Sequence, residues 1–239
     1  MKKFAIIWCV QGHGDDALQS HMISEFGKEG EVWEVLRPED ENFLERVFDY
    51  SGCIISGSQK SVVDDVEDPM VKNLLAFIRA AHEKNDMAVI GLCFGSQAIA
   101  AALGGQVGRN PSGQFKLGVD PLHWTDAARE SLGSALVDAP TVVVESHGEC
   151  VTVLPEQGVC LAASATCPHE VFAVGPRILG IQGHPEVDRE FLQQKFMVYQ
   201  RSFLSDAEWA RVEWESRQAL SPEPIIALGR RLLEEGRLQ

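Results

Sequence analysis

Short apolar segments alternate with amphipathic ones between residues 3 and 92, and this pattern limits the choice of fold more than any other feature. Asp68 and Pro69 suit the N-cap and the first position of a helix, which marks one boundary clearly. Strands separated by helices form βαβ units, so this half predicts a mostly parallel sheet. The predicted strands are residues 3–10, 32–36, 53–56 and 87–92, and the predicted helices are residues 16–29, 42–49 and 69–84.

After Gly105 the pattern changes to short strands without long helices between them. Residues 108–124 are rich in turn formers, and a helix at about residues 189–204 is expected to close the domain. We therefore expect an α/β fold of the flavodoxin-like type, with an open, mostly parallel sheet flanked by helices and an added mixed or antiparallel edge. The strands of this second half are predicted at residues 141–145, 159–163, 170–174 and 178–182.

The C-terminal segment, residues 205–239, is charged and amphipathic and is broken by Pro222 and Pro224. It predicts two surface helices. The 239-residue chain contains no internal repeat and no second apolar core. We expect one domain, residues 1–204, with residues 205–239 as a helical extension packed on it.

Composition excludes several classes of function. A formal net charge of −14 argues against nucleic-acid binding, which requires a basic face. Six cysteines without a CxxC pair favour a reducing, cytoplasmic location, and no apolar segment approaches transmembrane length, so no membrane association is expected. Residues 12–17 match the loose dinucleotide pattern GxGxxA, but Asp15 and Asp16 would repel a pyrophosphate, so a solvated helix cap is preferred.

A thiol stands between two glycines where the last strand of the first half meets an alanine-rich helix. The segment Gly91-Leu92-Cys93-Phe94-Gly95 has the form of a nucleophile elbow with cysteine in place of serine. The glycines are expected to permit the tight turn, and the positive end of the following helix is expected to favour the thiolate. The backbone N–H of Phe94 can then help to bind an oxyanion. Taken alone, the motif also fits a packing cysteine beside chance glycines.

A second strand end supplies the groups that such a thiol needs. The segment Gly183-His184-Pro185-Glu186 follows an apolar strand, and Pro185 biases His184 toward an extended conformation. Residues two apart in an extended segment point the same way, so the Glu186 carboxylate can orient the His184 ring. A base and its orienting partner beside a nucleophile form a Cys93-His184-Glu186 catalytic triad.

These motifs resemble those of the class I glutamine amidotransferase family, whose triad is cysteine, histidine and glutamate in this order. The resemblance rests on "GLCFGSQ" and "GIQGHPEV" and extends from the first strand to about residue 204, which it implies is the catalytic domain. It implies a second oxyanion N–H from Ser58 or its neighbour Gly57. It also implies that Gln97 and the backbone of Ser146-His147-Gly148 hold the α-amino and α-carboxyl end of a glutamyl substrate.

The features "GEVWEVLR" and "CIISGSQ", the stand-alone length and the helical tail look most similar to plant-type γ-glutamyl peptidases. The family commonly has Gly-Gly-Pro at its oxyanion turn, where this chain has Gly57-Ser58-Gln59, and the plant peptidases usually have histidine at the position of Ser96.

The resemblance implies a cysteine-dependent hydrolase of γ-glutamyl amide bonds in a small-molecule substrate, acting through a γ-glutamyl thioester. A glutaminase subunit that delivers ammonia to a separate synthase chain is the alternative, followed by a non-catalytic regulatory protein. No cofactor or metal is expected to take part. The segment Cys167-Pro168-His169-Glu170 offers two or three ligands without a second cluster, so it predicts a turn and not a metal site.

Overall fold

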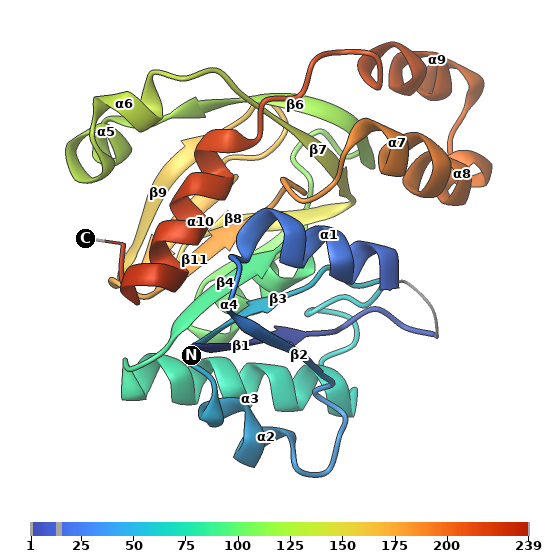
Figure 1. Ribbon diagram of the computed structural model, residues 1–239. Coiled ribbons are helices and arrows are strands. Elements are labelled where there is room, and N and C mark those ends of the chain that lie inside the picture. The colour runs from blue at the N-terminus through green and yellow to red at the C-terminus, as the bar shows by residue number, and fades with distance from the viewer. Residues whose placement is uncertain (1, 13–15, 239) are drawn as a thin grey trace.

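The computed structural model describes residues 2–12 and 16–238, so the segment at residues 12–17 lies partly outside the described residues. Nine strands form one sheet in the order β2-β1-β3-β4-β11-β10-β9-β6-β7, and β5 and β8 form a second sheet of two strands (Figure 1). The strands are β1 Lys3–Ile7, β2 Val32–Leu36, β3 Gly52–Ile55, β4 Ala88–Leu92, β5 Gln106–Arg109, β6 Lys116–Trp124, β7 Thr141–His147, β8 Glu149–Val153, β9 Gly158–Ala163, β10 Val171–Val174 and β11 Ile178–Ile181.

The five strands β2, β1, β3, β4 and β11 are parallel to one another. Their order, with β11 as the fifth strand, is the flavodoxin-like order 2-1-3-4-5. Every residue of β3, β4 and β11 is buried, which is why these segments are continuous apolar runs in the sequence. The prediction of a mostly parallel sheet is confirmed.

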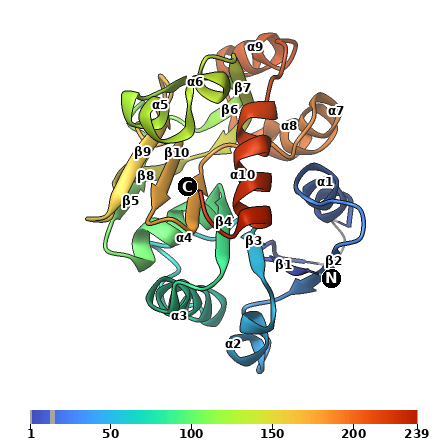
Figure 2. The same ribbon diagram turned by 60° about the vertical axis from the view of Figure 1, so that its left-hand side comes forward.

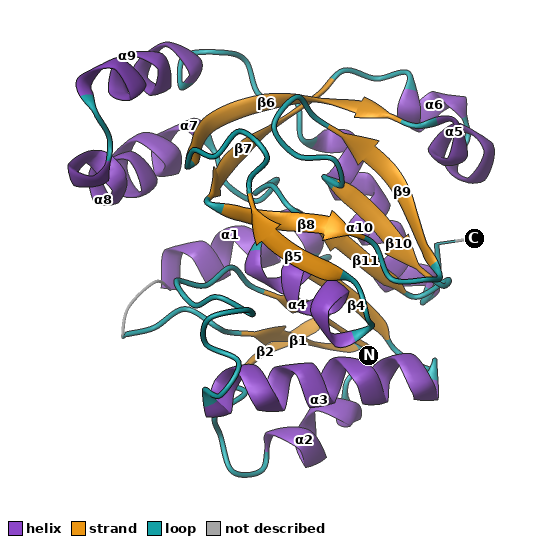
Figure 3. Cartoon of the chain, turned by 180° about the vertical axis from the view of Figure 1, so that it is seen from behind, coloured by secondary structure: helices purple, strands orange, loops and turns teal. Residues whose placement is uncertain are grey.

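The other half of the sheet is antiparallel. β10 pairs with β11 and β9, and β6 pairs with β9 and β7. The predicted antiparallel edge is therefore present. β5 and β8, which were not predicted as strands, pair with each other beside α4, as Figure 3 shows.

Helices cover both faces of the sheet (Figures 1 and 2). α1 and α10 pack on one face, and α2, α3 and α4 pack on the other. Asp68 caps α3 as predicted, because its side chain accepts a hydrogen bond from the N–H of Met70. The helices are α1 Asp16–Phe26, α2 Phe43–Arg46, α3 Pro69–Lys84, α4 Phe94–Ala102, α5 Asp126–Leu132, α6 Ser134–Val137, α7 Arg189–Phe191, α8 Met197–Gln200, α9 Asp206–Glu215 and α10 Glu223–Glu235, with a 3-10 turn, η1, at Val47–Asp49.

The C-terminal helix α10 contributes to the main core. Ile225, Leu228, Leu232 and Leu233 are buried in the same cluster as the side chains of β1 and β4. A Cβ on Gly229 would lie 2.6 Å from the Phe26 ring, so α10 approaches α1 more closely than a larger residue would allow. The boundary between domain and extension at residue 204 stays a prediction.

The helix predicted at residues 189–204 is irregular. A π-helical segment, η2 (Leu192–Phe196), separates α7 from α8, and a 3-10 turn, η3 (Arg201–Phe203), ends the run. Among the described residues, no helix combines the length and the apolar character needed to cross a membrane.

Candidate active site

The predicted elbow has a strained backbone conformation at the cysteine. Cys93 joins β4 to α4 with φ 50° and ψ −108°, a conformation that side chains other than glycine rarely adopt. The flanking glycines permit the tight turn, as predicted, but by allowing close packing, since neither has a positive φ. A Cβ on Gly91 would lie 2.5 Å from the backbone of Gly95, and a Cβ on Gly95 would lie 2.6 Å from the Ile55 carbonyl oxygen. The glycines therefore allow close packing, and the strain is at the cysteine.

His184 and Glu186 lie beside the thiol. The Nδ1 atom of His184 is 2.8 Å from Oε1 of Glu186, and both side chains are buried. The two residues meet across a turn and not along an extended segment, since the N–H of Val187 bonds to the carbonyl oxygen of His184. A Cβ on Gly57 would lie 3.3 Å from Cε1 of His184 and 3.8 Å from Cβ of Cys93, so that glycine lies against both residues.

Electrostatics favour a charged imidazole in this position. Burial alone lowers the pKa of His184, because it disfavours the charged ring. The negative charges of Glu186 and Cys93, together with hydrogen bonds to both side chains, outweigh burial and hold the pKa of His184 well above its usual value. The arrangement supports an imidazolium next to the sulfur of Cys93.

Aromatic packing from the irregular helix holds the histidine ring, a contribution that the sequence did not suggest. The ring of Phe196 packs edge-on against His184, with 5.0 Å between the ring centroids. Phe196 is the last residue of the π-helical segment η2, and such segments occur frequently at functional sites. Phe191 packs against Phe196 and against His21, whose Nδ1 lies 3.3 Å from the carbonyl oxygen of Glu186.

The predicted oxyanion donors lie at the ends of β3 and β4. Phe94 is the first residue of α4, where backbone N–H groups lack partners within the helix. Ser58 uses its hydroxyl to donate to the carbonyl oxygen of Cys9, and this bond fixes the turn that also contains Gly57. Ser96, on the first turn of α4, donates its hydroxyl to the carbonyl oxygen of Cys93 and so supports the elbow from within.

The predicted substrate-binding segment divides into two parts. The thiol of Cys93 points to the carbonyl oxygen of Ser146, with 3.8 Å between sulfur and oxygen. The side chain of His147 instead enters a separate buried cluster, and the carbonyl oxygen of Gly148 accepts the N–H of Asn110. Gln97 donates its side-chain amide to the carbonyl oxygen of Glu149 at 2.8 Å, which ties α4 to β8.

The separate cluster consists of Glu145, His147 and Glu170, which sequence reasoning did not group. Burial raises the pKa of Glu145 to about 8, although the nearby charges of His184 and Lys116 act in the opposite direction. Burial also raises the pKa of Glu170 well above its usual value and lowers that of His147. The predicted strand ended at Glu145, whereas β7 continues to His147, and the spacing of two residues places both side chains on one face.

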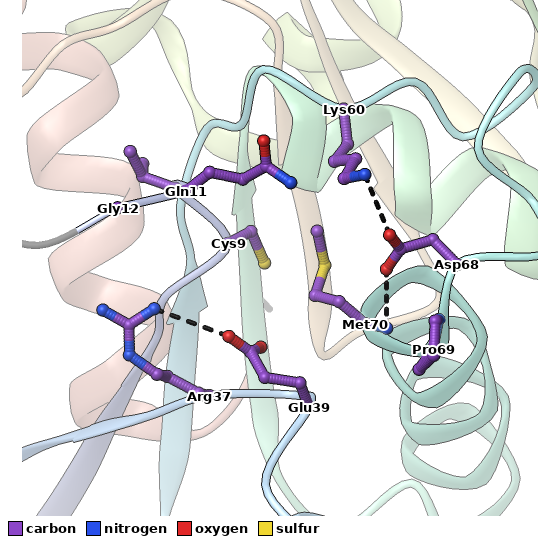
Figure 4. A pocket seen from close by; sticks show the side chains of 10 residues that line it. Cys9, Gln11, Gly12, Arg37, Glu39, Lys60, Asp68, Pro69 and Met70 are labelled. Carbon is purple, nitrogen blue, oxygen red and sulfur yellow. Dashed lines mark hydrogen bonds and ion pairs between the residues drawn. The ribbon is translucent and has the colours of Figure 1, made fainter.

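A hollow of about 340 Å³ lies at the carboxyl ends of β1 and β2 (Figure 4). Cys9, which lines it, is also the residue whose carbonyl oxygen accepts the Ser58 hydroxyl. Arg37 pairs with Glu39 at 3.5 Å and Lys60 with Asp68 at 2.8 Å, so both basic side chains that line the hollow already have acidic partners.

Comparison with known proteins identifies the family of the chain. The sequence profile of the family described as "Glutamine amidotransferase class-I" matches residues 16–198. "Gamma-glutamyl peptidase 3" of Arabidopsis thaliana is 31% identical over 214 residues, covering 81% of this chain and 83% of the plant protein. A "GMP synthase [glutamine-hydrolyzing]" of Aeromonas salmonicida is 31% identical over 147 residues, which cover 59% of this chain and 26% of the synthase.

Among solved structures, a glutamine amidotransferase of Thermotoga maritima superposes with a TM-score of 0.70 at 18% sequence identity. The superposition covers 98% of this chain and 97% of that one, so the two share a fold. The profile match and the similarity to the plant peptidase extend over most of the chain. The chain therefore belongs to the class-I glutamine amidotransferase family.

Proposed function

We propose that this enzyme is a cysteine-dependent hydrolase of γ-glutamyl amide bonds. Membership of the family supports amide hydrolysis in general, and the residues around Cys93 support the specific chemistry. The observation that carries the proposal is the placement of a strained cysteine beside an imidazole whose other nitrogen is held by a carboxylate. Cys93 is the proposed nucleophile, His184 the acid and base, and Glu186 the group that orients the histidine.

The first half of the reaction forms a thioester. The thiolate of Cys93 attacks the δ-carbonyl carbon of the γ-glutamyl group, and the carbonyl oxygen becomes an oxyanion. The N–H groups of Phe94 and of Ser58 or Gly57 are the proposed donors to that oxyanion. Nδ1 of His184 is hydrogen-bonded to Glu186. The other ring nitrogen, Nε2, therefore gives its proton to the departing amine as the C–N bond breaks.

The second half releases glutamate. Neutral His184 now accepts a proton from water, and the hydroxide formed attacks the thioester carbonyl carbon. The C–S bond breaks, the sulfur leaves as the Cys93 thiolate, and the imidazolium is restored. Each catalytic cycle thus begins and ends with His184 positively charged, the form that Glu186 stabilises.

The proposed substrate is a γ-glutamyl peptide or glutamine. Similarity to a γ-glutamyl peptidase over most of both chains supports a γ-glutamyl group on the acyl side. Gln97 and the backbone of Ser146, His147 and Gly148 are the proposed contacts to its α-amino and α-carboxyl groups. The carbonyl oxygen of Ser146 is 3.8 Å from the sulfur, which supports a role for it next to the reacting bond.

An assay with purified protein tests this proposal. Glutamine, glutathione and a γ-glutamyl dipeptide would be offered separately, with free glutamate, ammonia and the released amino acid or peptide all quantified. We expect the purified protein to release glutamate without any added partner protein. Cys93→Ser should lose the activity and Cys160→Ser, a half-buried cysteine on β9, should keep it. Equal activity of wild type and Cys93→Ser would refute the proposal.

A glutaminase subunit is the second candidate. The observation in its favour is the similarity to a GMP synthase, of which the matched region is only about a quarter. In that case ammonia would be delivered to a separate synthase chain, and glutamine turnover would rise strongly only when that chain is added. A non-catalytic regulatory protein would show no turnover with or without a partner.

We also place the enzyme in the cytoplasm, since its six cysteines include two buried thiols, Cys150 and Cys167, in hydrogen-bond contact with each other. Cell fractionation tests this location, and recovery of the protein outside the cytoplasmic fraction would contradict it.

A further inference from the structure

Three buried side chains next to the proposed active site face one another without a balancing positive charge among them. Glu145 and His147 lie on the same face of β7, and Glu170 immediately precedes β10. Their exposed fractions are 0%, 3% and 0%. One potential ligand atom from each lies within 4.8 Å of the others.

The hydrogen bonds around this cluster leave only acceptor atoms facing its centre. Nδ1 of His147 lies 3.0 Å from the carbonyl oxygen of Glu149, so Nδ1 carries the proton and Nε2 presents a lone pair. That Nε2 atom is 3.2 Å from Oε2 of Glu145. Oε1 of Glu170 accepts the hydroxyl of Ser164 at 2.6 Å. In the described part of the chain, Nε2 of His147, Oε2 of Glu170 and both carboxylate oxygens of Glu145 have no hydrogen-bond donor.

The nearby basic groups already have carboxylate partners of their own, and His184, whose charge acts on Glu145, is paired with Glu186 at 2.8 Å. Lys116, the buried lysine next to the cluster, forms ion pairs with Asp120 at 3.1 Å and with Glu215 at 2.9 Å. Its charge is therefore already matched by two carboxylates of its own. Two ionised glutamates in a fully buried site are costly unless a cation or added protons compensate them.

We propose that Glu145, His147 and Glu170 bind a divalent transition-metal cation of the Zn²⁺ type. An imidazole nitrogen and two carboxylates are ligands that Zn²⁺ accepts at about 2.0–2.2 Å, and two ligand atoms 3.2 Å apart can share one such ion. Metal-binding histidines almost always donate their other N–H to a carbonyl or carboxylate, as His147 does to Glu149, and ligating carboxylates are themselves hydrogen-bonded, as Glu170 is by Ser164.

The position of the cluster gives the ion a structural role. It would join the end of β7, which carries Ser146 and leads into Gly148, to the start of β10. It would also act on the strand that leads to the catalytic histidine, because a Cβ on Gly183 would lie 2.4 Å from Oε1 of Glu145. The three proposed ligands are buried, and the second carboxylate oxygen of Glu145, which also lacks a donor, can supply the fourth ligand of a closed, structural site.

Metal content and thermal unfolding test the proposal independently of activity. Wild-type protein from cells grown with added Zn²⁺ would be desalted, and its metal content would be measured by inductively coupled plasma mass spectrometry. Thermal unfolding would then be followed in EDTA and in Zn²⁺. Glu170→Gln and Glu145→Gln remove a ligand charge with little change of shape. Glu156→Gln, an exposed carboxylate outside the cluster, is the matched control.

The expected result is about one equivalent of metal per chain in wild type and in Glu156→Gln, and a large loss in both cluster variants. Free Zn²⁺ at about 100 times its Kd should raise Tm by roughly 5–10 °C in wild type and leave the cluster variants unchanged. Circular dichroism shows whether those variants fold. If the variants do not fold, the metal content and the Tm values of wild type still decide the question.

Metal-free wild-type protein with the same Tm in EDTA and Zn²⁺ would overturn the proposal. The cluster would then be neutralised by protons shared between the carboxyl groups and His147. A protonated-carboxyl band in the infrared spectrum that disappears in Glu145→Gln would identify that alternative.

Discussion

The strain at Cys93 has a measurable consequence for stability. In the middle of a helix or strand, glycine lowers the stability of a protein by about 0.5–1 kcal/mol relative to alanine. The reason is that the unfolded chain has more conformational freedom at glycine. Cys93 has a positive φ with ψ −108°, which lies outside the small left-handed region open to ordinary residues. The cost for any residue with a Cβ should be at the upper end of the usual range, about 3 kcal/mol.

We therefore expect Cys93→Gly to be more stable than Cys93→Ala. Relief of strain by glycine is partly offset by its entropy and by loss of one buried methyl, about 0.8 kcal/mol. A net gain of about 1 kcal/mol remains, which corresponds to roughly 2–4 °C in Tm for a domain of this size. Both variants lack the thiol, so the comparison isolates the Cβ.

Urea unfolding at equilibrium measures the difference, and α4 supplies a matched control. Ala98 is fully buried within that helix, so Ala98→Gly loses the same methyl at a position with no positive φ. We expect that change to destabilise the protein by about 2 kcal/mol. If Cys93→Gly is less stable than Cys93→Ala by a similar amount, the elbow is not strained and the reasoning is wrong.

Three further predictions concern the groups around the thiol. Glu186→Gln should lower kcat/KM by about 10²- to 10⁴-fold because the ring of His184 loses its orienting carboxylate, and steady-state kinetics with unchanged circular dichroism would check this. Gly57→Ala should lower kcat/KM by about 10- to 100-fold with little change in Tm, since the added methyl would lie 3.3 Å from Cε1 of His184; unchanged kinetics would contradict this placement. Because the pKa of His184 is raised in the folded protein, its charge stabilises the fold fully below about pH 6.5, the pKa of an unfolded histidine. This stabilisation falls as pH rises through the folded pKa, by up to about 1.4 kcal/mol per pH unit. Urea midpoints between pH 6 and 9 should therefore show the advantage of wild type over His184→Gln shrinking with pH, and a constant difference would exclude the charged histidine.

The parallel half of the fold was predictable because its signals are local. β2 and α3 have the bounds predicted from the sequence, because an apolar strand and a capped helix can each be identified from a few neighbouring residues. β5 and β8 were missed because they form a small sheet of their own, in which neither strand is a continuous apolar run.

At the candidate site, the sequence indicated which residues meet but not how the backbone brings them together. Cys93, His184 and Glu186 carry chemical signatures at strand ends, so they could be grouped. The cysteine has the positive φ while the flanking glycines serve close packing, and no sequence pattern records that division.

The buried cluster was hidden for a related reason. Glu170 lies 25 positions after Glu145 and was interpreted as part of a turn, and only the antiparallel half of the sheet brings it next to β7. Phe196 was equally invisible, because a regular helix through residues 189–204 would not contain the π-helical segment that carries it to His184.

Capture of the covalent intermediate tests directly whether Cys93 is the nucleophile. Wild-type protein would be mixed with a γ-glutamyl substrate, quenched in acid within milliseconds and digested, and its peptides weighed by mass spectrometry. We expect one γ-glutamyl group on the peptide containing Cys93, formed before glutamate is released and absent from Cys93→Ser. Glutamate release with Cys93 unmodified at all times, or an adduct on another cysteine such as Cys150, would contradict this expectation.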